Sequence, residues 1–472
     1  MSLLSESEIL RILREQNSWW VSGRVPEGLA PSFKRNEYEK VKKIFFNKIR
    51  RFPVLSGPRR VGKSTIMFQI IDELLQSGVN PSRIMYYTLD EFPNDSISVK
   101  DAVDIFRRYY CDGDEYYLFI DEAQKDPSWK NYLKTVYDLN PKVKAMVTGS
   151  ASVELEKNSD DSGTGRFFTV KIPTLSFYEY CELCGKHIKI DDGIDIFSFH
   201  KLPIQEQTAI VTKISPLHRD MIRYLTCGGF PEFVGSDDYS YISILIRDQV
   251  INKVVRQDIP RAFNIRNTDG LANLYTYFCF NSSEVVNIDT ISNLLQIDRN
   301  TCTEYIRALE KANLIYVCEQ LNLGGKKPLK PRRKIHIADN AIICAVTRKN
   351  DILADDTTFG AAVETAAYKH TRDYFDSIDS IYNVGYTRSD DGKEIDIVVQ
   401  ENSCDIQYVE EKNRFDSRIR DTDGIVVYGM ADTPGYVITR NDDDFGLSER
   451  KNTSLYRIPA TVYLYLLGKM KR

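Results

Sequence analysis

Residues 52–65 read FPVLSGPRRVGKST, and a helical pattern, TIMFQIIDELLQ, continues from residue 65. An apolar stretch, a loop of the pattern G-x-x-x-x-G-K-[ST] and a helix follow one another, which is the context in which this pattern binds phosphate. Glycine lets the backbone fold closely around a phosphate, and the amides at the start of the helix offer it positive potential. We therefore predict a nucleotide-binding loop made of Gly57, Pro58, Arg59, Arg60, Val61, Gly62, Lys63, Ser64 and Thr65.

Two side chains of this loop have predicted roles toward ATP and Mg²⁺. Lys63 supplies a positive charge to the β- and γ-phosphates, and the Ser64 hydroxyl ligates the metal ion. Further apolar stretches alternate with helical patterns at 84–89, 117–120, 143–147 and 167–172. Strands separated by helices favour a mainly parallel sheet covered on both faces. We predict an α/β core over residues 51–173, after a helical lead-in over residues 1–50.

Composition excludes several classes of protein. The chain has 472 residues, of which 42% are apolar and 28% charged, so it is neither fibrous nor disordered. No stretch approaches the roughly 20 apolar residues of a membrane span. Nine scattered cysteines favour a reducing compartment, so we expect a cytoplasmic protein without a membrane role. The net charge of −4 means that nucleic acid would have to bind a local basic patch.

Hydrolysis needs a second group of residues, and the stretch YYLFIDE at 116–122 ends in two carboxylates. Asp121 is expected to hold Mg²⁺ through water, and Glu122 to polarise the attacking water. The next apolar stretch ends in Thr148-Gly149-Ser150, where a hydroxyl could sense the γ-phosphate. Thr148 and Ser150 compete for this role, and we favour Ser150.

The motifs GPRRVGKST, FIDEAQ, VTGSAS, GR at 165–166, PTLSFYEY and GGFPEFV occur in this order, after the lead-in QNSWW. In this the sequence resembles archaeal and bacterial ATPases of the AAA+ superfamily that carry an additional C-terminal domain. The resemblance implies a P-loop sheet domain followed by a helical lid over 174–270. It makes Arg166 the first choice for an arginine acting on the γ-phosphate, with Arg59 and Arg60 as alternatives; a simple ion pair of Arg166 with a local carboxylate is the other explanation. It also suggests that Pro231 contacts the adenine, although a turn between helices explains Gly229-Phe230-Pro231 equally well.

Residues 271–345 show the order helix, turn, helix and strand, and the family resemblance also points to a winged helix. Its second helix would present Arg299, Thr301, Thr303, Glu304 and Arg307 to DNA. A basic strip lies where a wing is expected, consisting of Lys326, Lys327, Lys330, Arg332, Arg333 and Lys334. A dense group of positive side chains binds DNA phosphates with an affinity that depends on salt and is independent of base sequence. A solvated loop or a protein-docking winged helix remains the alternative.

The region 355–472 contains an Asp followed on the next strand by Glu-x-Lys. Asp396 lies within an apolar stretch, and the strand period of two places Glu410 and Lys412 on one face, which Asp396 can share. This is the PD-(D/E)xK arrangement, in which two carboxylates hold Mg²⁺ or Mn²⁺ against a phosphodiester and the lysine acts on water. Glu364, on a predicted helix, resembles the helical acid of such sites. We predict a restriction-endonuclease-like α/β domain, although a hairpin with surface Glu and Lys also explains the pattern.

Together these features predict an ATP-binding, Mg²⁺-dependent ATPase that acts on DNA and carries a nuclease-like domain. It is also expected to assemble as a homo-oligomer, because an arginine can act on a neighbour's nucleotide. Two other functions stay open. One is an ATP-dependent DNA motor or branch-migration factor whose nuclease-like domain grips DNA without cutting it. The other is a nucleotide-switched protein-interaction ATPase with no role on DNA.

Overall fold

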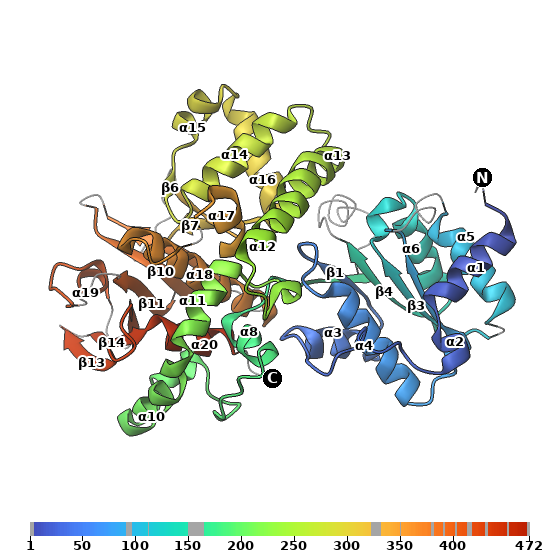
Figure 1. Cartoon of the computed structure of the whole chain (residues 1–472), viewed down its shortest axis with the longest axis horizontal. Coiled ribbons are helices and arrows are strands. Elements are labelled where there is room, and N and C mark those ends of the chain that lie inside the picture. Colours follow the sequence, from blue (N-terminus) through green and yellow to red (C-terminus); the bar gives the residue numbers. More distant parts are fainter. Residues whose placement is uncertain are drawn as a thin grey trace. The chain divides into compact units, whose positions relative to one another are not determined.

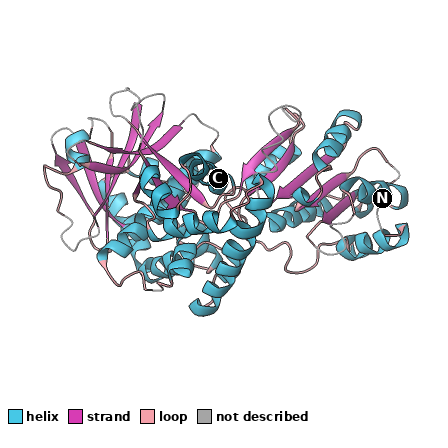
Figure 2. Ribbon diagram, turned by 90° about the horizontal axis from the view of Figure 1, so that it is seen from above, coloured by secondary structure: helices cyan, strands magenta, loops and turns pink. Residues whose placement is uncertain are grey.

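The structure of the chain is a computed structural model, and it divides into two compact units, residues 1–172 and 173–472 (Figure 1). Each unit contains its own sheet, with helices beside the strands (Figure 2). The described residues are 4–90, 97–111, 113–149, 165–321, 332–349, 351–378, 382–389, 392–401, 404–412, 418–429, 433–450 and 453–469. No helix among them is long and apolar enough to cross a membrane.

The first unit is built on a parallel sheet with the strand order β2-β3-β4-β1-β5. Its strands are β1 (Phe52–Ser56), β2 (Ile84–Thr88), β3 (Tyr117–Asp121), β4 (Lys144–Gly149) and β5 (Phe167–Lys171). All five strands predicted from the sequence are present, and the α/β class is confirmed. The phosphate loop leaves the carboxyl end of β1, between its neighbours β4 and β5, where ligands bind in open sheets of this class.

Helices cover both faces of this sheet (Figure 1). One face packs against α1 (Glu6–Gln16), α5 (Val99–Tyr109) and α6 (Trp129–Leu139). The other face packs against α3 (Tyr38–Phe46) and α4 (Lys63–Gln76), through ring contacts of Phe45 with Phe119 and of Phe68 with Tyr86. Both faces are therefore apolar, as expected for parallel strands.

The lead-in belongs to the first unit. Ser5 and Glu8 form a capping box at the start of α1. After α1, the Asn17 side chain bonds both the amide and the carbonyl of Tyr86, and the indoles of Trp19 and Trp20 donate to the carbonyl of Ile84. The short helix α2 (Trp19–Ser22) follows. These contacts satisfy backbone groups of β2, which lies at the edge of the described sheet.

The second unit has a mixed sheet with the order β13-β14-β12-β11-β10-β9-β7-β8-β6. Its strands are β6 (Val285–Val286), β7 (Ile315–Gln320), β8 (Arg333–Ile337), β9 (Tyr382–Arg388), β10 (Glu394–Glu401), β11 (Cys404–Lys412), β12 (Gly435–Thr439), β13 (Gly446–Arg450) and β14 (Thr453–Pro459). β7 pairs antiparallel with β8 and parallel with β9. The 271–345 and 355–472 segments therefore share one sheet.

The helix, turn and helix expected near residue 290 are present as α15 (Ile288–Leu295) and α16 (Arg299–Lys311), after α14 (Thr268–Phe280). Asn287 and Asp298 cap α15 and α16, and Gln296 adopts φ 53° in the turn between them. The strand expected after α16 is β7.

The remaining helices of the second unit surround its sheet. They are α8 (Phe177–Leu183), α9 (Ile196–Phe199), α10 (Ile204–Ile214), α11 (His218–Cys227), α12 (Tyr239–Ile246), a π-helical stretch (Arg247–Asp258), α13 (Ile259–Phe263), α17 (Asn340–Thr347), α18 (Asp356–Ser377), α19 (Gly424–Tyr428) and α20 (Ala460–Gly468). Buried side chains of α8, α10 and α11 join those of α18 and α20 in one core, so much of the predicted lid packs within the second unit.

Candidate functional site

The phosphate loop has the backbone shape that its sequence predicts. Arg60 and Gly62 adopt φ values of 62° and 94°, so successive peptide groups can turn inward. A Cβ on Gly57 would lie 2.0 Å from the carbonyl oxygen of Ile172, which excludes any larger residue there. α4 begins at Lys63, and its first-turn amides are left for a ligand.

Lys63 is buried and lies over this loop. Its Nζ donates to the carbonyl oxygens of Pro58 (2.7 Å) and Gly57 (3.0 Å). Burial lowers the pKa of Lys63, and the nearby carboxylates of Glu122 and Asp121 offset this in part. Because its described hydrogen-bond acceptors are neutral carbonyls, a phosphate group would stabilise its charge.

Asp121, at the end of β3, collects three hydroxyl groups. Oδ2 accepts from the hydroxyls of Ser64 (2.6 Å) and Tyr86 (2.8 Å), and Oδ1 accepts from Thr148. The motif indicated Ser64, and Thr148 was one of the two candidates at the end of β4. Tyr86 was missed, because a tyrosine in a buried strand has no local signal that its hydroxyl reaches a neighbouring strand.

Glu122 follows directly and adopts φ 53°, a left-handed conformation that non-glycine residues rarely take and that often marks functional sites. Its amide donates to Thr148 Oγ1 (3.1 Å), and its carboxylate accepts from Gln124 Nε2 (2.5 Å). Thr148 thus holds both carboxylate residues in position. Ser150, the favoured sensor, lies outside the described residues.

These groups fit a magnesium ion bound together with a nucleotide. The Ser64 hydroxyl and the Asp121 carboxylate already lie together at the loop, and oxygen ligands of this kind suit Mg²⁺. Ser64 would hold the ion directly and Asp121 through water. The ion would neutralise phosphate charge.

Arginines near the loop have different surroundings. Arg35, which the sequence analysis missed, is buried and donates to the carbonyl of Val61 (2.5 Å), so it supports the loop. Arg59 lies 3.9 Å from Asp90. Arg166 binds Asp138 through two hydrogen bonds of 2.8 and 3.1 Å. It precedes β5, whereas the loop follows β1, and these strands run parallel in register. Arg166 and the loop therefore lie at opposite ends of the sheet, about 20 Å apart along six residues.

The GGFP segment joins parts of the second unit. The amide of Gly229 donates to Asp339 Oδ2 (2.9 Å), and its carbonyl accepts from the amide of Leu175 (2.6 Å). A Cβ on Gly228, whose φ is 79°, would lie 1.9 Å from Asp339 Oδ1. The two glycines are therefore explained by close packing within this unit, and Pro231 follows them at the start of a short 3₁₀ turn.

The predicted DNA-contacting residues lie on and beside α16. Arg299 and Arg307 are exposed, and Arg299 pairs with Asp289 (3.2 Å). Lys326, Lys327 and Lys330 lie outside the described residues. Arg333 lies 3.7 Å from Glu319 with its side chain 36% exposed, and Arg332 is exposed.

Lys334 requires a correction, because it is not available to a phosphate. Its side chain is 4% exposed, and its Nζ lies 2.8 Å from Glu364 Oε1 and 3.5 Å from Asp396 Oδ1, with a further contact to Glu394. Strand alternation turns Lys334 inward from β8 while Arg333 stays at the surface. Burial opposes the charge of Lys334, but the three carboxylates outweigh it and raise its pKa well above that of an ordinary lysine.

Contacts divide the four residues of the predicted nuclease site into two groups. Asp396 and Glu364 lie with Lys334, whereas Glu410 accepts from the amide of Ile425 (2.8 Å) and Lys412 pairs with Asp423, both beside α19. The register between β9 and β10 shifts between Ile395 and Val398, and the described pairs of β10 with β11 begin only at Ile397. Asp396 lies in this irregular stretch, so the alternation of a regular strand does not predict which face its side chain takes. Asp396 Oδ2 instead accepts from the amide of Glu411 (2.8 Å).

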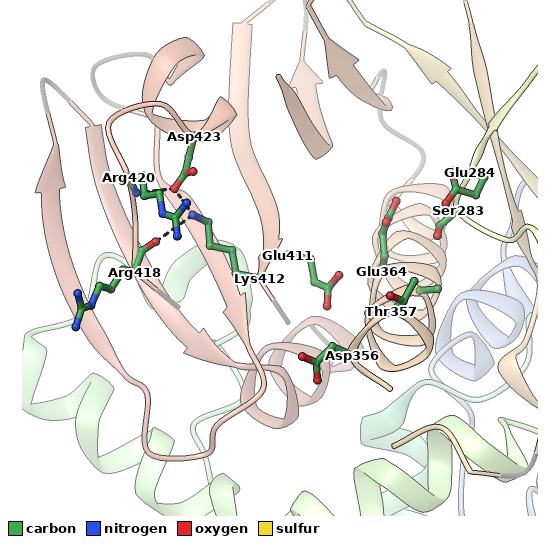
Figure 3. Close-up of a pocket in the computed structure, with 12 residues that line it drawn as sticks. Ser283, Glu284, Asp356, Thr357, Glu364, Glu411, Lys412, Arg418, Arg420 and Asp423 are labelled. Carbon is green, nitrogen blue, oxygen red and sulfur yellow. Dashed lines mark hydrogen bonds and ion pairs between the residues drawn. The ribbon is translucent and has the colours of Figure 1, made fainter. Parts of the chain in front are cut away.

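Glu411, which the sequence analysis passed over, faces the same space as Glu364 (Figure 3). The two line a pocket of about 430 Å³ between α18 and the end of β11, to which Asp356 and Arg420 also contribute. Burial raises the pKa of Glu411 well above the usual value, and that of Glu364 to about 8. Burial also raises the pKa of Glu410 to about 7.

These carboxylates do not fit a metal ion as they stand. Within the described parts of the chain, no three His, Cys, Asp or Glu side chains are placed to hold one ion. The ammonium group of Lys334 already lies among three of these acids, Glu364, Glu394 and Asp396.

Comparisons with known protein families match three regions of the chain. Residues 50–181 match the family described as "AAA domain", which supports a P-loop ATPase domain of the AAA+ superfamily and ATP hydrolysis. Residues 218–352 and 359–461 match two families described as domains of unknown function, DUF8612 and DUF4143.

Relatives and solved structures show more distant likeness. An uncharacterised protein of Haemophilus influenzae is 28% identical over 61% of this chain and 67% of its own length, and one of Methanocaldococcus jannaschii is 25% identical over 69% and 68%. Among solved structures, the Walker-type ATPase PABY2304 of Pyrococcus abyssi has a TM-score of 0.41 at 12% identity, covering 67% of this chain and 96% of that protein. The ORC2 protein of Aeropyrum pernix has a TM-score of 0.38 at 12% identity, covering 68% and 96%.

Proposed function

We propose that this protein is a Mg²⁺-dependent ATPase that acts on DNA, with Lys63 and Ser64 binding the nucleotide and its metal ion. The observation that carries the ATPase role is the set of hydroxyls around Asp121, which joins the phosphate loop to β3 and β4. Glu122, held beside it by Thr148, is the group that polarises water. ATP binding would replace the neutral contacts of Lys63 with phosphate contacts.

DNA binding is supported by the second unit. Helix, strand, two capped helices and two strands follow one another from α14 to β8, which is the order of a winged helix. α16 presents exposed Arg299 and Arg307, and Arg332 and Arg333 lie at the start of β8. Exposed acids also lie on α16, among them Glu304, so the expected affinity comes mainly from phosphate contacts near the wing.

The position of Arg166 supports the further proposal that several copies assemble. Since Arg166 lies at the far end of its own sheet from the loop, it can act on the γ-phosphate of a neighbouring copy. Its pairing with Asp138 would then be exchanged for phosphate in the assembly. This is the supply of an arginine in trans that phosphoryl transfer uses.

The test is ATP hydrolysis by the full chain, with and without duplex DNA. Lys63→Ala should abolish tight nucleotide binding, whereas Glu122→Gln should keep binding and lose at least about 100-fold in rate, because only the group acting on water changes. Parental turnover by Glu122→Gln would refute the assignment. Hydrolysis that ignores DNA, together with no measurable DNA binding, would favour the protein-interaction ATPase instead.

A nuclease role is the alternative that the Asp, Glu-x-Lys pattern on β10 and β11 suggests, although the contacts of Lys334 with Glu364 and Asp396 argue against it. A supercoiled-plasmid assay with Mg²⁺ or Mn²⁺, with and without ATP, tests it. Nicking that disappears in Asp396→Asn would establish it. An uncut plasmid that is nevertheless bound would favour a domain that grips DNA without cutting.

A further inference from the structure

The acidic cluster of the second unit is closed around a lysine from a different segment of the chain. Lys334 is the second residue of β8, and it is 3% exposed. The acids come from elsewhere: Glu364 from α18, and Glu394 and Asp396 from β10. Burying an unpaired ammonium group costs much free energy. Lys334 can therefore be buried here only because these acids pair with it.

The contacts use the whole hydrogen-bonding capacity of the ammonium group. Lys334 Nζ lies 2.8 Å from Glu364 Oε1, 3.5 Å from Asp396 Oδ1, and in contact with Glu394. A lysine has three N–H donors, and three carboxylates surround this one. The ring of Tyr386, whose centroid is 5.3 Å from Nζ, adds the favourable face of an aromatic group.

A divalent cation and this ammonium cannot share the cluster. Mg²⁺ requires oxygen ligands at about 2.1 Å in octahedral geometry, and these oxygens are instead arranged around Nζ. The second oxygen of Asp396 is also occupied, because it accepts from the amide of Glu411 (2.8 Å).

We propose that Lys334 is the resident cation of the cluster formed by Glu364, Glu394 and Asp396, and that it takes the place of a divalent metal ion. The region then does not cut DNA by metal-ion chemistry. The proposal rests on the proposed function and deepens it, because it assigns the nuclease-like region a binding role. The proposal also explains why Lys334 is buried while its neighbour Arg333 stays partly exposed.

Removing the lysine should create the metal site that it replaces. The experiment uses the full chain without nucleotide or DNA, in an Asp121→Asn background that removes the metal ligand of the ATP site. Free Mn²⁺ is titrated and followed by its electron paramagnetic resonance signal. The parent should show no Mn²⁺ site that depends on Asp396, and Lys334→Ala should gain one site per chain, bound at least tenfold more tightly than any background site.

Two controls make the result specific. Arg333→Ala, which removes the neighbouring charge at the surface, should behave as the parent, and adding Asp396→Asn to Lys334→Ala should abolish the new site. If Lys334→Ala does not fold, Lys334→Met keeps the aliphatic stem and loses the charge. A parent Mn²⁺ site that disappears with Asp396→Asn would overturn the proposal, as would folded lysine variants that gain none. Because neither ATP nor DNA is present, the outcome is independent of the proposed ATPase and DNA roles.

Discussion

Replacing Glu364 with glutamine should remove one share of a pH-dependent loss of stability in the second unit, which Glu410 and Glu411 also cause. Burial raises the pKa of Glu364 from 4.5 to about 8, with Lys334 opposing the shift and Asp396 and Glu394 reinforcing it. A carboxyl with a raised folded-state pKa gives stability that is full below its unfolded pKa and is lost as the pH rises toward 8. At 1.36 kcal/mol per pKa unit, the loss between pH 5 and pH 8 is about 3 kcal/mol.

Glutamine is neutral and nearly isosteric with the protonated acid, so the variant should lose about 3 kcal/mol less stability than the parent between pH 5 and pH 8. Urea unfolding followed by far-ultraviolet circular dichroism at several pH values from 5 to 8 measures it. The three tryptophans, Trp19, Trp20 and Trp129, all belong to the first unit, so their fluorescence reports that unit separately and should be unchanged.

Glu304→Gln, an identical charge change at an exposed position of α16, is the matched control and should keep the parental slope. Glu410 and Glu411, whose pKa values burial also raises, remain in both proteins and contribute to the pH dependence of both. A Glu364→Gln variant that loses as much stability as the parent between pH 5 and pH 8 would refute the assignment of the proton to Glu364.

Three further predictions concern the ATP and DNA sites. Thr148→Val should slow ATP hydrolysis by at least about tenfold with little change in nucleotide affinity. The substitution removes the hydroxyl that holds Asp121 and the amide of Glu122, and each of these hydrogen bonds contributes about 1 kcal/mol. An unchanged rate of hydrolysis would contradict this. Arg332→Ala with Arg333→Ala should weaken DNA binding for all sequences and change the log–log salt slope by about 0.9 for each phosphate that is no longer neutralised, and an unaltered slope would remove these residues from the interface. Arg166→Ala should bind ATP and hydrolyse it slowly, and mixing it with Lys63→Ala should restore activity, since each copy supplies what the other lacks; failure of mixing to restore it would count against action in trans.

The sequence predicts the first unit well because its signals are local. The phosphate loop, the two carboxylates after β3 and the alternating strands each occupy consecutive residues, and their backbone geometry follows from glycines, apolar runs and a helix start. Tyr86 and Arg35 could not be predicted, because their partners Asp121 and Val61 are 35 and 26 residues away and nothing local requires the contact.

The second unit shows a different kind of failure. The α15–α16 turn and the strands β9 to β11 follow the expected pattern, but strand alternation alone put Asp396 with Glu410 and Lys412. The register shift in β10 changes that grouping. Lys334 stands in a basic run that suggests a solvated surface, and the acids that bury it lie 30 to 62 residues further along the chain.

Two buried lysines show why one site favours binding an anion and the other does not. Lys63 donates to neutral carbonyls, and burial lowers its pKa. Its charge is therefore poorly compensated until a phosphate arrives, and nucleotide binding supplies the missing negative charge. Lys334 is surrounded by carboxylates that raise its pKa well above the usual value, so its charge is already compensated within the fold. A phosphodiester brought to this cluster would meet acids whose lysine is already paired with them. The same residue type thus leaves a charge for a phosphate at the first site, whereas at the second its charge is already paired with acids, in line with our proposal that it takes the place of a metal ion.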